Sequence, residues 1–139
     1  MMKIKASIFK EIAESPAPPP EVGGIIGGKE DIITCYFADE GSKENCYDSY
    51  YPSTDLLNKQ IEKWQDEKID FYGIYHTHFA GDDGLSSSDR RYIVNIMQAM
   101  PSQIRYLYFP IVFKNNMLIY KAIRENNIVK IVQEDIEIV

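Results

Sequence analysis

The stretch that decides the fold is residues 73–93, GIYHTHFAGDDGLSSSDRRYI, which contains both histidines of this 139-residue chain. His76 and His78 come at the end of a short, largely apolar run over residues 69–75 (IDFYGIY) that has the composition of a β-strand. In an extended segment, residues i and i+2 point to the same side, so both imidazoles can reach one point in space. This spacing is typical of two metal ligands.

A carboxylate follows the two histidines in the first turn of the next predicted helix. That helix begins at about Ser86, and Asp89 lies where backbone N–H groups and the helix dipole keep a carboxylate ionised and oriented. Two histidines and one aspartate make three ligands, which leaves a fourth position for water, as in catalytic zinc sites. The alternative is that His76 and His78 are two solvated or core imidazoles with no metal.

Composition predicts one soluble domain over residues 1–139, with 45% hydrophobic and 26% charged residues. No apolar run approaches the roughly 18 residues of a membrane span, and the first residues lack the features of a signal peptide. Two cysteines without a C-x-x-C motif favour a reducing compartment, so we expect a cytoplasmic protein. The net charge of −6 argues against a nucleic-acid partner.

Hydrophobic periodicity predicts three helices separated by β-rich runs. The predicted helices are an amphipathic one over residues 6–15, a second after the Ser/Thr-rich entry at 52–55, and a third from about Ser86 to the residue before Pro101. Glycine-punctuated β runs over residues 21–28 and 31–41 predict a strand pair. The last part of the chain, residues 103–139, contains three β-rich runs, which predict an antiparallel meander.

Together with a serine, these residues form a longer pattern: His76-x-His78, seven residues, Ser86, two residues, Asp89. The pattern resembles the signature of the JAMM, or MPN-plus (JAB domain), zinc metalloproteases. That signature also has an upstream glutamate that opens a glycine-containing strand, and Glu21 opens EVGGIIGG in the expected position. The order of the predicted elements is similar over nearly the whole chain, and the short chain looks like a minimal, prokaryotic-type member.

The resemblance implies roles for five residues. His76, His78 and Asp89 would be the ligands of Zn²⁺, and Glu21 would be the general acid/base that acts on the water of the metal. Ser86 would help to stabilise the tetrahedral oxyanion, although its place also fits a helix N-cap, and one residue can do both. The implied fold is α/β, with a mixed, curved β-sheet flanked by helices in a three-layer architecture similar to that of cytidine deaminases.

The resemblance also implies a reaction and a partner. The expected activity is a zinc-dependent peptidase or isopeptidase that hydrolyses an amide bond after the C-terminal tail of a ubiquitin-like or sulfur-carrier β-grasp protein. In that family the tail is received as an added β-strand. Two alternatives stay open: a non-catalytic or partner-activated binding or scaffold module of the same fold, and a non-haem iron enzyme built on two histidines and a carboxylate. No nucleic-acid or membrane partner is expected.

Overall fold

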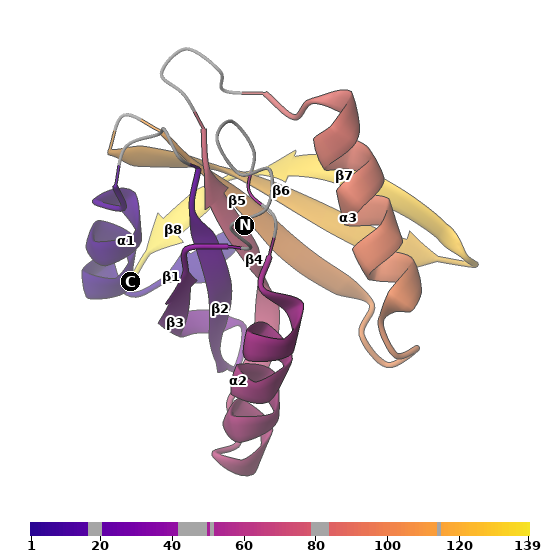
Figure 1. Ribbon diagram of the computed structural model, residues 1–139, viewed down its shortest axis with the longest axis horizontal. Helices are drawn as coiled ribbons and strands as arrows, with labels where there is room; N and C mark the ends of the chain where they lie inside the picture. The colour runs from indigo at the N-terminus through magenta and orange to yellow at the C-terminus, as the bar shows by residue number, and fades with distance from the viewer. Residues whose placement is uncertain (17–20, 42–49, 51, 79–83, 114) are drawn as a thin grey trace.

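The structure is a computed structural model that describes residues 1–16, 21–41, 50, 52–78, 84–113 and 115–139. In order along the chain, its elements are β1 (Met2–Ile4), α1 (Ala6–Ala13), β2 (Gly23–Lys29), β3 (Ile32–Asp39), α2 (Thr54–Asp66), β4 (Asp70–Thr77), α3 (Ser87–Ala99), β5 (Tyr106–Phe113), β6 (Asn116–Glu125), β7 (Ile128–Glu134) and β8 (Ile136–Ile138). The strands form one mixed, curved sheet in the order β7-β6-β5-β4-β2-β3-β1-β8 (Figure 1). None of the helices in these described ranges is long and apolar enough to cross a membrane.

The helices cover both faces of the sheet, so that the fold has three layers (Figure 1). Neighbouring residues of β2 show the division, because successive side chains of a strand point to opposite faces. Ile26 packs with α1 on one face, and Ile25 packs with α2 and α3 on the other, and neither side chain is exposed. The predicted mixed, curved sheet flanked by helices is therefore confirmed.

Strand β4 lies in the middle of the sheet, between antiparallel β2 and parallel β5. The register places Gly23 of β2 opposite His76 of β4. The chain that leads into β2 therefore passes beside the end of β4 that carries the two histidines. This register is what places Glu21, two residues before Gly23, next to them.

The three predicted helices, the strand pair and the antiparallel meander β5-β6-β7 are all present. The sequence-based prediction was wrong at the two ends of the chain. It missed β1, and it treated residues 127–139 as one run, which the structure divides into β7 and β8. Strand β8 pairs in parallel with β1 at the opposite edge of the sheet from β7. A three-residue strand with two buried side chains, Met2 and Ile4, is too short to give a periodic signal.

The C-terminal end of α3 is fixed to the sheet by Arg124 of β6. Its guanidinium donates hydrogen bonds to the backbone carbonyl oxygens of Met97, Met100, Pro101 and Ile104. The Met97 and Pro101 carbonyl oxygens also accept the backbone N–H groups of Met100 and Ile104, and a cation at this end of α3 complements the helix dipole. Because α3 carries Asp89 at its other end, this contact also fixes the helix that supplies a candidate ligand.

We expect Arg124→Met to lower the free energy of unfolding by about 2–4 kcal/mol, since it removes several charge-assisted hydrogen bonds and keeps most of the aliphatic volume. Equilibrium urea unfolding measures the change. Arg105→Met, at an exposed position nearby, is the control and should change stability by no more than about 0.5 kcal/mol. Equal stability of the two variants would contradict the proposal that the hydrogen bonds of Arg124 stabilise the end of α3.

Candidate metal centre

The two histidines lie at the C-terminal end of β4 and point to the same side, as the strand geometry predicts. His76 is 7% exposed and His78 is 3% exposed, and their Nε2 atoms are 2.8 Å apart. The backbone N–H of His78 donates to the carbonyl oxygen of Val112 on β5, at 2.9 Å. Both rings are therefore held by buried, hydrogen-bonded backbone.

Asp89 reaches the histidines from the first turn of α3. Its Oδ2 lies 3.3 Å from Nε2 of His78, and its Oδ1 lies 3.6 Å from Nε2 of His76. A capping box orients the carboxylate: the Asp89 N–H donates to Ser86 Oγ at 3.0 Å, and the Ser86 N–H donates to Asp89 Oδ2 at 3.1 Å. The helix N-terminus and the two imidazoles thus share one carboxylate.

Glu21 is the fourth group at this point, and it is 7% exposed. Glu21, His76 and His78 each place a possible ligand atom within 4.8 Å of the other two. The side chain between the two histidines helps to fix Glu21, because Thr77 Oγ1 accepts a hydrogen bond from the N–H of Val22 at 2.9 Å, and Thr77 N–H donates to the Val22 carbonyl oxygen at 2.8 Å. Sequence reasoning missed this role of Thr77, since it depends on strand register.

The surroundings set the protonation states that a metal requires. Burial, reinforced by the neighbouring His78, lowers the pKa of His76 to about 4 against the opposing effect of Asp89. His76 is therefore neutral at pH 7, and its contact with Asp89 is not an ion pair. Burial raises the pKa of Asp89, but the hydrogen bonds from His78 and from the Ser86 N–H outweigh it and lower this pKa to about 2.

The donor set fits a zinc ion. In a tetrahedral site with ligands about 2.0–2.1 Å from zinc, donor atoms lie about 3.3 Å apart. The three separations among His76, His78 and Asp89 are 2.8, 3.3 and 3.6 Å. Two imidazoles and one carboxylate are also ligand types that zinc takes in catalytic sites. The set Glu21, His76 and His78 could hold a metal as well, so the geometry allows two choices of third ligand.

Ser86 is the predicted site residue whose observed contacts are structural. Its Oγ accepts the hydrogen bond from the Asp89 N–H and lies 3.0 Å from Ser88 Oγ, so it is the N-cap of α3. The residue is exposed at the helix start, next to the ligand cluster. Its hydroxyl hydrogen is compatible with donation to an oxyanion, and that role stays a prediction.

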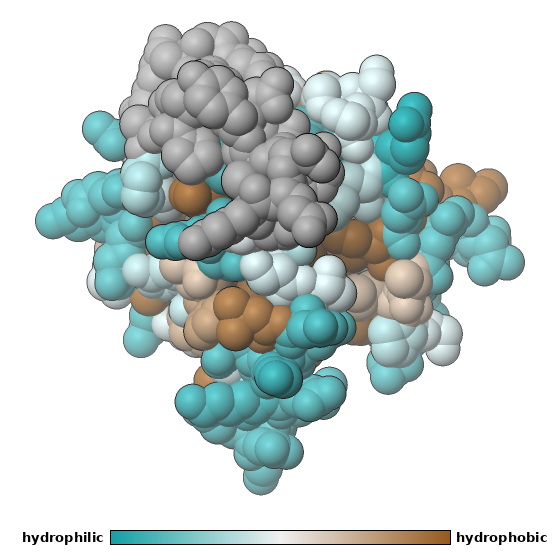
Figure 2. Space-filling model, in the orientation of Figure 1, coloured by the Kyte–Doolittle hydropathy of each residue, from teal (hydrophilic) through white to brown (hydrophobic). Residues whose placement is uncertain are grey.

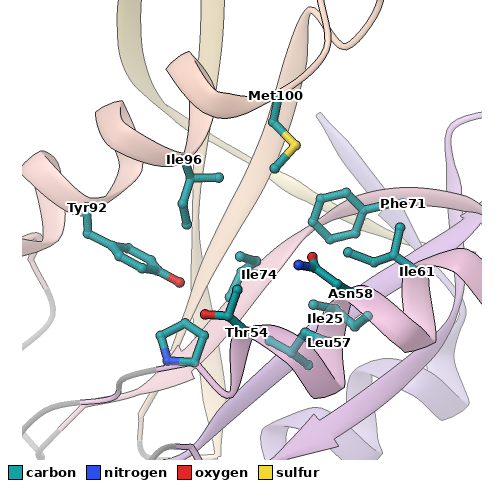
Figure 3. A pocket seen from close by; sticks show the side chains of 11 residues that line it. Ile25, Thr54, Leu57, Asn58, Ile61, Phe71, Ile74, Tyr92, Ile96 and Met100 are labelled. Carbon is teal, nitrogen blue, oxygen red and sulfur yellow. The ribbon is translucent and has the colours of Figure 1, made fainter.

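An apolar pocket of about 170 Å³ opens between α2 and α3, over strands β2 and β4 (Figure 3). Figure 2 shows hydrophobic surface on the flank where these helices face each other, whereas the free end of α2 is hydrophilic. Tyr92, Ile96 and Met100 line the pocket from α3, and Leu57 and Ile61 line it from α2. Tyr92 is one turn beyond Asp89, so the pocket begins beside the candidate metal centre.

The hydroxyl oxygen of Tyr92 is buried and has no hydrogen-bond partner, the one such side-chain atom among the residues that the structure describes. A buried polar group without a partner costs about 1–3 kcal/mol. In Figure 3 the ring of Tyr92 extends from α3 toward Thr54 of α2. A ligand in the pocket that offers a polar atom would satisfy this hydroxyl.

No protein-family model matches the sequence, and no curated protein matches it. The fold, however, is similar to that of two solved structures. A solution structure of a protein from Desulfitobacterium hafniense superposes with a TM-score of 0.70 at 14% identity, covering 100% of this chain and 93% of that one. The crystal structure of a JAB1/MPN domain protein from Archaeoglobus fulgidus superposes with a TM-score of 0.54 at 14% identity, covering 100% of this chain and 97% of that one.

The chain has an MPN-like fold. In this MPN-like fold the Glu21, His76 and His78 group could bind a metal ion, and Asp89 lies against both histidines. At 14% identity the likeness is one of architecture. The assignment of chemistry therefore depends on the side chains of this chain.

Proposed function

We propose that this protein is a zinc-dependent peptidase or isopeptidase of the JAMM type, which hydrolyses an amide bond after the C-terminal tail of a ubiquitin-like or sulfur-carrier β-grasp protein. The observation that carries the proposal is that Glu21 and Asp89 both lie beside the His76 and His78 pair in an MPN-like fold. The four residues come from three parts of the chain, namely the segment before β2, the end of β4 and the first turn of α3, so local packing alone does not account for their proximity. A scaffold module does not require such a set.

In this proposal His76, His78 and Asp89 hold the metal. A zinc ion bound there supplies Lewis acidity toward a substrate carbonyl and lowers the pKa of a water to about 7. Glu21 accepts a proton from the attacking water on its carboxylate and returns it to the leaving nitrogen. Ser86 donates its hydroxyl hydrogen to the oxyanion while it keeps its bond from the Asp89 N–H.

The pocket between α2 and α3 supports a peptide tail as the ligand. A cavity of roughly 150 Å³ holds one benzene-sized group, so the observed volume of about 170 Å³ suits one aliphatic side chain of an extended tail. A polar atom of the tail beside that side chain would pair with the buried Tyr92 hydroxyl. We place the reaction in the cytoplasm, in keeping with the free thiol of Cys35, whose pKa is raised by burial.

Elemental analysis of the purified protein tests the metal site before any substrate is known. We expect about one zinc per chain in the wild type and little or none in Asp89→Ala and His78→Ala, because each variant removes a ligand. Asp55→Ala is the matched control, since it removes an exposed aspartate from the first turn of α2 and should keep the metal. If the wild type holds no metal even after zinc is added, the proposed enzyme activity fails, and the remaining explanation is a binding module of MPN-like fold.

A further inference from the structure

A buried carboxylate at the end of β3 anchors the hydroxyl of Tyr50. Asp39 is 5% exposed, and its carboxylate accepts hydrogen bonds from Tyr50 Oη at 2.8 Å, from Ser53 N–H at 2.9 Å and from Gly41 N–H at 3.0 Å. Burial raises the pKa of Asp39, but these hydrogen bonds together outweigh it and keep the pKa below its ordinary value. Tyr50 is thus tied to a fixed, ionised partner.

The ring of Tyr50 stacks on the imidazole of His76. The ring centroids are 6.2 Å apart and the planes differ by 10°, which is an offset-stacked arrangement. Gly23, opposite His76 on β2, makes room for this ring: a Cβ at position 23 would lie 2.7 Å from the ring carbons of Tyr50. Tyr50 therefore packs against both the backbone of β2 and the imidazole of His76.

We infer that Tyr50, anchored by Asp39, is a positioning residue that holds the His76 ring in its metal-binding orientation. The inference rests on the metal centre proposed above. The Nε2 atom of His76 meets His78 and Asp89 in one ring orientation, and a flat ring fixed against the imidazole limits its rotation out of that orientation. Residues that orient a ligating histidine typically contribute about 10- to 100-fold to metal affinity.

Metal affinity of the full-length protein, measured by competition with a chromophoric zinc chelator, tests the inference. We expect Tyr50→Leu to weaken zinc binding about 10-fold or more, because it removes the ring. Tyr50→Phe and Asp39→Asn should lose less, because each keeps the ring and disturbs only its anchor. Tyr36→Leu is the matched control: Tyr36 packs against Tyr75 elsewhere on the sheet, and its removal should leave zinc affinity unchanged.

A measurement on the metal-free protein separates this inference from the proposed function. The chain has two histidines, so a spectrum of histidine-labelled protein contains two sets of ring signals, which His78→Gln assigns. Loss of the stacked ring in Tyr50→Leu should move the His76 ring protons downfield, and Tyr36→Leu should leave them in place. If Tyr50→Leu fails to fold, Tyr50→Phe can replace it, with a smaller expected shift of the His76 ring protons.

The outcomes are distinct. Unchanged zinc affinity and unchanged His76 signals in a folded Tyr50→Leu protein would overturn the inference while the metal centre stands. A wild type that binds no zinc would overturn the metal centre, and the ring signals alone would then decide whether Tyr50 positions His76. If Tyr36→Leu lowers zinc affinity as much as Tyr50→Leu does, the effect comes from a general loss of stability, and the inference is overturned.

Discussion

Replacing Glu21 by glutamine is expected to lower the rate of amide hydrolysis by about 10²- to 10⁴-fold while zinc stays bound, because the amide cannot carry the proton between water and leaving nitrogen. Glutamine keeps the size of the side chain and its place beside the two imidazoles. The rate is measured as release of an amine reporter from the tails of a panel of β-grasp proteins, and the zinc content is measured on the same samples.

Glu62→Gln is the control for this change, because Glu62 is an exposed glutamate on α2 and its loss should leave the rate unaltered. The experiment also decides between the two possible sets of three ligands. If Glu21→Gln loses its zinc and Asp89→Ala keeps it, then Glu21 is a ligand and our assignment is reversed. A variant with both zinc and full activity would place the proton transfer on another group.

Three of the four groups at the candidate site have a local signal in the sequence. His76 and His78 follow from strand alternation, and Asp89 follows from the helix start. Glu21 had no local signal of its own and came from the resemblance of the whole pattern. Its placement beside His76 is explained afterwards by the β2–β4 register and by the hydrogen bonds of Thr77 to Val22.

The contacts that hold the site could not be predicted from the sequence. Tyr50 is far from His76 along the chain, and its stacking depends on the register that puts Gly23 opposite His76 and on the carboxylate of Asp39. A tyrosine in a β-rich region is more often packing than function, so its sequence context gave no reason to single it out. Such contacts depend on tertiary structure alone.

The same distinction applies to the fold. Helices α1, α2 and α3 were predicted because eight or more residues of periodic sequence give a repeated signal. Strands β1 and β8 were missed because they have three residues each, and their pairing joins opposite ends of the chain. No local pattern reports which edge of a sheet a short strand will join.

Gly73→Ala is expected to destabilise the protein by more than about 4 kcal/mol, or to prevent folding, because two penalties add at one position. Gly73 has φ of +153°, which L side chains rarely adopt, and a Cβ there would lie 1.8 Å from the carbonyl oxygen of Tyr108. Tyr108 is the residue that pairs with Gly73 across the β4–β5 ladder. Neither backbone can move aside without breaking the centre of the sheet. Domains of this size have a free energy of unfolding of about 5–15 kcal/mol, so the expected loss is a large part of the total stability.

Gly84→Ala is the matched control, since a Cβ at that position meets no atom of the described residues within 4 Å, and it should change stability by no more than about 0.5 kcal/mol. Urea unfolding of the two variants measures the difference directly. Because His76 lies near the end of β4 and His78 directly follows the strand, three and five residues beyond Gly73, any Gly73→Ala protein that folds should also bind zinc more weakly than Gly84→Ala. Equal stability of the two glycine variants would mean that β4 and β5 can move apart more easily than their observed contact allows. In that case β5 would not hold β4 in place, and the histidines of the metal centre would be supported by β2 alone.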